Sequence, residues 1–345
     1  MVMKRLWFLF FTGMIAVGAV FAQNEMQTVA TVRLTRTEPI TVKQLQNEVA
    51  LMEAQAKRPL TVDEKNQVLE ALINQRLVLQ AAERDRITVS DGELTQQIDR
   101  LRDSLAQTMG RRPTEAEFTQ TIRSQYNLDM PSFREQVRRQ LIMERYLTSK
   151  KEDLLKSATA PTVAEIQNFY DLNKSSLVRP DTVRLSIIQV PSGDDKAKAK
   201  SLADSLAREI GTDPAKFDEV SLRQGREAGF VAGDAGYLPK NPQGEQAVGA
   251  EVLRTAFSLE QGQVSGVIEG PRGYQILKVT ESYKQKQLTL DDVIDLDSKM
   301  TVRQYINAGL SQNKQISLLT QAQQELYDEL RKGDPFTIDK RYLPW

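Results

Sequence analysis

Residues 273–279 read Gly-Tyr-Gln-Ile-Leu-Lys-Val, and this mostly apolar run after a glycine predicts a β-strand. A second run of the same kind occupies residues 264–269. The turn sequence Pro271-Arg272-Gly273 stands between the two runs. We therefore expect two neighbouring strands that close a small domain.

The residues before this pair predict the rest of the domain. An apolar run from Val183 to Ile188 predicts a strand that ends at Pro191-Ser192-Gly193. Residues 195–210 follow as a helix, a second helix begins near Pro214, and a glycine-rich stretch leads to a third helix at about 251–257. The order β-α-α-α-β-β is typical of a compact α+β domain.

The residues on the amino-terminal side of this domain predict helices. A short extended segment at 28–34 and a turn at Glu38-Pro39 precede a helical pattern from Thr41 to about Ser157. Repeated Ser/Thr-x-x-Glu capping boxes mark helix starts, because the hydroxyl and the glutamate satisfy free backbone N–H groups. The pairs are Thr61 with Glu64, Ser90 with Glu93, Thr114 with Glu117, Ser132 with Glu135, and Thr162 with Glu165. We expect about five helices, and a sixth that ends near Asn173.

The carboxyl-terminal residues predict one more helix, from about 289 to 332. An isolated helix of this composition would bury too little apolar surface to be stable alone. We therefore expect it to pack on the amino-terminal helices, so that the helical module is discontinuous in sequence. The stretch Ala158–Pro161 is predicted to be a hinge.

The first residues predict export. Lys4 and Arg5 precede an apolar run at 6–21, and Val20-Phe21-Ala22 has the small residues of a cleavage site. This pattern predicts a signal peptide cleaved after Ala22. An uncleaved anchor is the alternative, although the run is shorter than the roughly 20 residues that span a bilayer. No later stretch is long and apolar enough to span a membrane, so a periplasmic location is expected.

Two residue types are missing, and their absence excludes whole classes of chemistry. Without cysteine there are no disulfides, no thiolate and no lipid-anchor cysteine. Without histidine there is no serine–histidine triad and no usual zinc site. The 46 basic and 46 acidic residues balance, which argues against a nucleic-acid surface. No Gly-x-x-x-x-Gly-Lys-Ser/Thr motif for a nucleotide occurs. No metal or cofactor is expected.

Three segments resemble the signature of parvulin-type (PpiC, rotamase) prolyl isomerase domains: residues 233–237, 256–265 and 273–279. The helical flanks, with residues 38–41, 71–77 and 133–142, are similar to those of SurA-like periplasmic chaperones and of PrsA-type foldases. The resemblance implies an α+β fold in which a mostly helical chaperone module carries one inserted parvulin-like domain. The expected division is 1–22 signal peptide, 23–174 SurA-like helical domain, 175–283 parvulin-like domain, and 284–345 carboxyl-terminal helix.

The resemblance also implies where a catalytic cleft would lie. In the family, two histidines and a cysteine or aspartate form a hydrogen-bonded centre above an aromatic floor. The two histidine positions match Ser186 and Gln275, and the thiol or acidic position falls near Arg223. The floor position, five residues before Phe257, matches Val252. We therefore expect a degenerate cleft without efficient isomerase activity, and no catalytic residue is assigned.

The leading hypothesis is an ATP-independent holdase for unfolded exported polypeptides, above all outer-membrane proteins. One alternative is an active or weakly active prolyl isomerase. The other is a structural assembly subunit that binds one fixed envelope partner. The sequence identifies neither the clients nor the oligomeric state.

Overall fold

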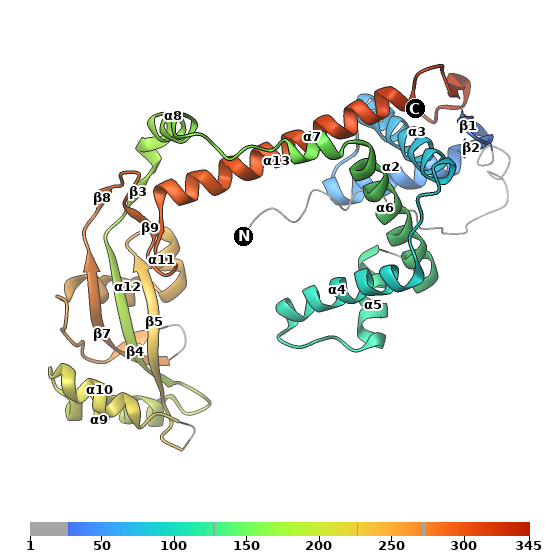
Figure 1. The fold of residues 1–345 in the computed structure, drawn as a ribbon. Helices are drawn as coiled ribbons and strands as arrows, with labels where there is room; N and C mark the ends of the chain where they lie inside the picture. Colours follow the sequence, from blue (N-terminus) through green and yellow to red (C-terminus); the bar gives the residue numbers. More distant parts are fainter. Residues whose placement is uncertain (1–26, 127, 226, 271–272) are drawn as a thin grey trace. The chain divides into compact units, whose positions relative to one another are not determined.

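The computed structural model describes residues 27–126, 128–225, 227–270 and 273–345 (Figure 1). The predicted signal peptide and the predicted turn residues Pro271 and Arg272 lie outside these ranges. The chain forms two compact units: unit 1 holds Met1–Ala158 and Lys314–Trp345, and unit 2 holds Thr159–Asn313. No helix in the described part of the chain is long and apolar enough to cross a membrane.

Unit 1 is mostly helical, as predicted. Its helices are α2 (Val42–Ala56), α3 (Val62–Arg84), α4 (Asp91–Met109), α5 (Glu115–Tyr126), α6 (Met130–Lys150) and the short α7 (Glu152–Lys156). The capping boxes predicted at Thr61, Ser90 and Thr114 are confirmed, because each hydroxyl accepts from the glutamate N–H and each glutamate accepts in return. A further box that the sequence did not suggest pairs Thr41 with Gln44 at the start of α2.

The box predicted at Ser132 and Glu135 is wrong. Helix α6 begins earlier, and its cap is Asp129, whose Oδ1 accepts from the Ser132 backbone N–H at 2.9 Å. Pro131 lies in the first turn of the helix. A proline is tolerated there because the first N–H groups of a helix have no intrahelical acceptor. Ser132 is therefore inside the helix rather than at its cap.

A small sheet joins the two ends of unit 1. Its strands are ordered β11-β1-β2, with β1 at Thr28–Val32, β2 at Glu38–Thr41 and β11 at Phe336–Ile338. In the register, Ala30 lies opposite both Ile338 and Ile40. The turn predicted at Glu38-Pro39 is wrong, since both residues belong to β2. Proline is accepted in this strand because β2 is an edge strand that needs fewer backbone donors.

The carboxyl-terminal helix packs on the amino-terminal helices, as predicted. Helix α13 (Val302–Leu330) contributes Ala322, Leu326 and Leu330 to the core that contains Leu77 and Tyr146. Outside that core, Lys151 Nζ lies 2.7 Å from Glu329 Oε1. Two segments remote in sequence thus form one module.

The start predicted for this helix, near residue 289, is wrong. Residues 289–301 instead contain the paired strands β9 (Val293–Asp295) and β10 (Met300–Thr301). The Asp292 carboxylate accepts from the Thr289 N–H, and the Asp295 carboxylate accepts from the Asp297 N–H. Aspartate side chains that bind nearby backbone N–H groups in this way favour turns over helix.

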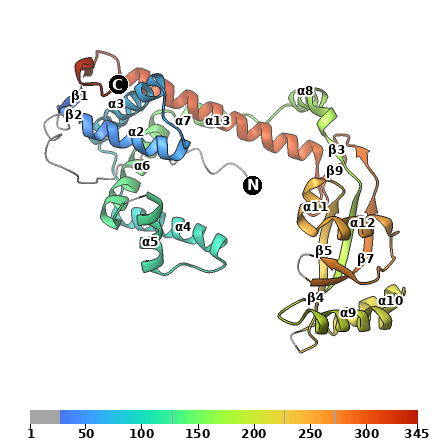
Figure 2. The ribbon, with the colours of Figure 1, turned by 180° about the vertical axis from the view of Figure 1, so that it is seen from behind.

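Unit 2 is built on an antiparallel sheet of order β5-β4-β7-β6, with helices on both faces (Figure 2). Its central elements are β4 (Thr182–Pro191), α9 (Lys196–Ile210), α10 (Pro214–Leu222), β5 (Val231–Pro239), α11 (Pro242–Val248), α12 (Ala250–Ser258), β6 (Ile268–Gly270) and β7 (Gly273–Tyr283). The α+β class is confirmed, but the predicted element order lacked β5 and α11. Strand β5 was not predicted because its glycines do not form a strand pattern. Gly236, at φ +78°, lies beside a bulge in the pairing of β5 with β4. The strand predicted at 264–269 is shorter than expected.

The remaining elements of unit 2 lie at its chain ends. They are α8 (Val163–Asn173), the single turn η1 (Lys174–Ser176), and the paired strands β3 (Val178–Arg179) and β8 (Lys286–Gln287). A small core joins Ile166 of α8 to Leu288, Leu290 and the start of α13 at Val302. Because of this core, residues 159–174 and 284–313 belong to unit 2, whereas the sequence division assigned them to the helical segments.

Candidate functional site

The two faces of the unit 2 sheet carry different neighbours. On one face, Ile188 of β4 and Ile276 of β7 pack with α9 and α10. On the other face, Leu185 of β4 and Leu277 of β7 pack with α12. Because side chains alternate along a strand, odd-numbered residues of these parts of β4 and β7 face α12 and even-numbered residues face α9 and α10.

Gln275 lies on the α12 face and is buried, with 5 % of its surface exposed. Its Nε2 donates to Gln189 Oε1 at 3.2 Å. Its own Oε1 is buried, and no residue in the described ranges donates to it. Gly270 leaves room for this side chain, because a Cβ at that position would lie 3.0 Å from Gln275 Nε2. The result is a pair of hydrogen-bonded amides, Gln275 buried and Gln189 half-buried, at the end of the sheet where β4 finishes.

Two of the other predicted cleft residues lie on the same face. Val252 on α12 is fully buried, and a Cβ on Gly270 would lie 3.4 Å from its Cγ2, so Val252 and Gln275 flank the same glycine. Phe257, at the end of α12, packs against the same apolar cluster. Lys240 Nζ lies 5.5 Å from the centroid of the Phe257 ring. The structure therefore brings Val252, Phe257 and Gln275 to one face.

Ser186 does not join them. It lies on the face of α9 and α10, opposite Asp234 of β5 and Lys278 of β7 in the strand register. The neighbouring Ile187 instead shares the face of Gln275 and packs with the α12 cluster. The alternation from Leu185 through Ile187 to Gln189 is the sequence signal that would have identified this face.

Arg223 also does not contact the amide pair, and its neighbours are different. It follows the last residue of α10 and is exposed, with its guanidinium 2.6 Å from Glu209 Oε1 on α9. This ion pair ties α10 to α9. The five predicted cleft residues thus fall into two groups, and only the group on the α12 face surrounds a buried polar centre.

The chemistry available at the amide pair is limited. A glutamine amide donates and accepts hydrogen bonds but does not titrate in the physiological range. Ile187 on the same face offers no polar atom at all. Within the described part of the chain, no group of three acidic residues gathers as metal ligands would. The pair can hydrogen-bond to a peptide group, but it cannot transfer protons as an imidazole does.

A network of ionised groups links β4, β5 and β7 near the start of β4. The Arg184 guanidinium bonds to Asp234 Oδ2 at 2.5 Å and to Glu281 Oε1 at 3.1 Å, and Tyr237 donates to Glu281 Oε2 at 3.0 Å. The hydrogen bond with Arg184 lowers the pKa of Asp234, and the hydrogen bond from Tyr283 lowers that of Glu281. Glu281 in turn raises the pKa of Tyr283 to about 12. Arg184, Asp234 and Glu281 therefore keep fixed charges at neutral pH, so the network holds the strands together rather than exchanging protons.

Unit 1, in contrast to these polar groups of unit 2, has a row of apolar side chains that reaches the surface. One face of α4 carries Leu94, Ile98, Leu101, Leu105 and Met109 at helical spacing. Leu94 and Ile98 are buried against α5 and α6, Leu101 and Leu105 are half-buried, and Met109 is 47 % exposed. We call Leu101, Leu105 and Met109 the α4 stripe. It continues a buried core outward to the surface.

Two family models each match one part of the chain. The family described as the SurA-like N-terminal domain matches residues 2–147, and the PPIC-type PPIase domain matches residues 161–295. Foldase protein PrsA of Clostridium botulinum is 24 % identical over 249 residues, which are 70 % of this chain and 67 % of that protein. Chaperone SurA of Nitrosospira multiformis is 26 % identical over 240 residues, which are 67 % of this chain and 50 % of that protein.

Two solved structures match this chain at low sequence identity. A structure from a study of PEB4 and Cj1289, two SurA-like chaperones of Campylobacter jejuni, is 15 % identical, with a TM-score of 0.38 over 91 % of this chain and 100 % of that chain. PrsA of Bacillus anthracis is 17 % identical, with a TM-score of 0.24 over 75 % of this chain and 96 % of that chain.

Proposed function

The chain joins a SurA-like N-terminal domain to a PPIC-type parvulin domain, and from this premise we propose that it is an ATP-independent chaperone that holds unfolded exported proteins in the periplasm. Its parvulin domain serves as a scaffold without efficient isomerase activity. The clients are outer-membrane and other envelope proteins that have left the export channel unfolded.

The observation that carries the holdase proposal is the α4 stripe. Leu101 and Leu105 are half-buried and Met109 is 47 % exposed, so the stripe presents apolar surface at the end of α4, and such apolar surface is typical of faces that bind other proteins. Leucine and methionine side chains adapt their shape, which suits a surface that accepts many apolar sequences. Since the stripe continues a buried core, the helix stays in place without a client, and the surface is ready for binding.

The amide pair supports the proposal for the parvulin domain. Prolyl isomerisation has a rotation barrier of about 18–20 kcal/mol, and the family lowers it at a polar centre beside a proline pocket. Here that face offers Gln275 with Gln189, and Ile187 stands beside them. Hydrogen bonds from an amide stabilise a bound peptide equally before and during rotation unless they strengthen in the transition state. Binding without rate enhancement is the result that we expect.

The holdase proposal is tested by the aggregation of a chemically unfolded outer-membrane protein after dilution. Wild-type protein at several-fold molar excess should keep the client soluble, and Met109→Ser combined with Leu105→Ser should reduce this effect. Val62→Ser is the matched control, because Val62 is 56 % exposed on α3 but lies outside the stripe. No suppression by wild-type protein would refute the proposal. Equal suppression of aggregation by the stripe variant would show that the α4 stripe does not bind the client.

A weakly active isomerase is the second candidate, and the buried Oε1 of Gln275 favours it. An acceptor without a donor in the described ranges is available to a substrate that carries one. This candidate predicts that the protein accelerates refolding limited by proline isomerisation and that Gln275→Ala slows the catalysed phase. Gln224→Ala, at an exposed position in the loop after α10 whose side chain bonds to the Ala232 N–H rather than to the amide pair, should leave the rate unchanged.

The periplasmic location depends on the predicted signal peptide. Expression of the full chain in a Gram-negative host should give a mature protein in the periplasmic fraction whose first residue is Gln23. A product that starts at Met1 or remains in the membrane fraction would contradict it. Recovery of many unfolded clients rather than one stoichiometric partner would exclude the assembly-subunit alternative.

A further inference from the structure

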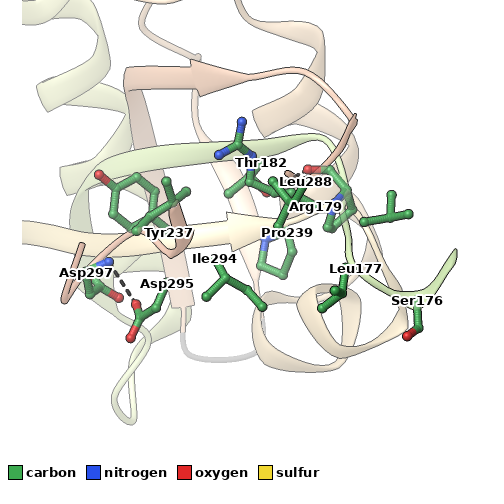
Figure 3. Close-up of a pocket in the computed structure, with 13 residues that line it drawn as sticks. Ser176, Leu177, Arg179, Thr182, Tyr237, Pro239, Leu288, Ile294, Asp295 and Asp297 are labelled. Atoms are coloured by element: carbon green, nitrogen blue, oxygen red, sulfur yellow. Dashed lines mark hydrogen bonds between the residues drawn. The ribbon is translucent and has the colours of Figure 1, made fainter. Parts of the chain in front are cut away.

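A pocket of about 330 Å³ lies in unit 2, away from the amide pair. Thr182, the first residue of β4, lines it, whereas Gln189 lies seven residues further along the strand, about 23 Å away at 3.3 Å per residue. The walls come from β3, the end of β5 and the β9 segment (Figure 3). The pocket is therefore separate from the cleft that the sequence predicted.

The pocket is mainly apolar. Leu177 and Leu288 are buried at its base, and Pro239 and Ile294 are half-buried in its wall. Figure 3 shows the side chains of Tyr237, Pro239 and Ile294 gathered around one space, from β5 and from β9. A volume of this size is at the lower limit of ordinary ligand sites and holds one large side chain with adjoining backbone rather than a folded domain.

Polar groups of both signs border this apolar space. Arg179 places its guanidinium 4.9 Å from the Tyr283 ring centroid, and its buried Nε has no acceptor among the described residues. Lys299 Nζ lies 3.4 Å from the Tyr237 hydroxyl. Asp295 and Asp297 contribute carboxylates, and Asp295 Oδ1 accepts from the Asp297 N–H at 3.0 Å. Hydrogen-bond donors and acceptors therefore lie around the apolar centre of the pocket.

These features favour one class of ligand. A peptide segment has an apolar side chain between a carbonyl acceptor and an N–H donor, and the pocket has complementary groups for all three. The two aspartates offset the charges of Arg179 and Lys299, so the pocket has no net positive charge to attract a phosphate or a nucleotide. A metal ion would find no group of three ligands in the described part of the chain.

We propose that this pocket binds one apolar side chain of an unfolded polypeptide, with the adjacent backbone carbonyl accepting from Arg179. It is a second docking point for clients, on unit 2, in addition to the α4 stripe of unit 1. This inference rests on the proposed chaperone function. It gives the parvulin domain a binding role that needs no isomerase chemistry.

The test fills the pocket in the full-length mature protein. Ile294→Trp places a larger side chain in the apolar space, and Leu172→Trp is the matched control, because Leu172 is 74 % exposed on α8 of the same unit and does not line the pocket. The probe is a reduced and carboxymethylated unfolded protein labelled with a fluorophore, and its Kd is measured by anisotropy. We expect Ile294→Trp to raise the Kd at least about tenfold, which corresponds to the loss of one buried apolar side chain, and the control to leave it unchanged.

A second variant guards against misfolding. Asp297→Trp blocks the pocket from an exposed rim position, so it acts even if Ile294→Trp disturbs the fold, and thermal unfolding of both variants reports on their stability. If wild-type protein binds the probe and folded pocket variants bind equally well, the pocket proposal is overturned while the chaperone proposal stands. If wild-type protein binds no unfolded probe, the chaperone proposal fails and the pocket proposal fails with it.

Discussion

The α4 stripe of unit 1 and the amide pair of unit 2 are opposites. The stripe leaves Met109 exposed and Leu101 and Leu105 half-buried, whereas the amide pair buries the Gln275 side chain and half-buries Gln189. Exposed apolar patches and buried polar groups are the two informative departures from the usual distribution of residues. Only the first presents apolar side chains to solvent, and the second has no titratable group. We therefore propose the stripe as a client-binding surface and assign no catalytic role to the amide pair.

The largest expected effect is a difference in unfolding free energy between variants at the two ends of the apolar face of α4. Leu94→Ala should cost about 2–5 kcal/mol of unfolding free energy, because Leu94 is buried against α5 and α6 and its loss leaves a cavity. Met109→Ala should cost less than about 0.5 kcal/mol, because that side chain is largely exposed. Urea unfolding of the two variants measures both. Similar losses would show that Met109 belongs to the core and that no stripe exists.

A smaller effect is expected at the amide pair. Changing Gln189 and Gln275 together to Leu should change stability by no more than about 1 kcal/mol, and the sign should favour the variant, since the buried Oε1 without a donor is removed. Client holding should be unaffected. Calorimetric melting and the aggregation assay measure the two quantities. A loss of chaperone activity without a loss of stability would move client binding to the sheet.

The face assignment of β4 gives a comparison of activities. Ile187→His with Gln275→His puts two imidazoles on the α12 face, whereas Ser186→His with Gln275→His puts them on opposite faces. We expect only the first pair to accelerate proline-limited refolding, by a modest factor, because the rest of the pocket is not restored. Acceleration by the Ser186 pair alone would mean that the register of β4 is different from the one described.

The smallest effect is a dependence on pH at the start of α4. Hydrogen bonds from Arg145 and from the Ser90 cap lower the pKa of Glu93 from 4.5 to about 2. Since the folded pKa lies below the unfolded value, this stabilisation is complete above about pH 4.5 and is lost as the pH falls toward 2. Glu93→Gln should therefore flatten the stability curve of unit 1 between these values. An unchanged curve in the variant would show that Glu93 does not contribute.

The helices of unit 1 were predictable because their starts are encoded locally. Thr61, Ser90 and Thr114 each act on backbone groups within one turn, so a four-residue pattern is sufficient. Strand β5 was missed because its glycines weaken the local signal and its pairing with β4 is made over a long sequence separation. The start of α13 was misplaced because Asp292 and Asp295 bind nearby backbone N–H groups instead of entering a helix.

In the predicted cleft, too, local motifs identified some residues correctly, whereas a position that depends on strand pairing was misplaced. Gln275 and Val252 were identified from motifs and lie on one face. The β4 position was assigned to Ser186 instead of Ile187, and a shift by one residue moves a side chain to the other face of a sheet. The bulges at Arg184–Ser186 set this register, and they depend on contacts with β5 and β7 that no local pattern reports.

The most direct measurement follows the proline-limited refolding of an unfolded substrate, with and without the mature protein, and records the soluble fraction in the same samples. We expect the slow phase to keep its uncatalysed rate while the soluble fraction rises. A slow phase accelerated in proportion to protein concentration, without a gain in soluble substrate, would contradict this expectation and show that the sheet of unit 2 carries the function.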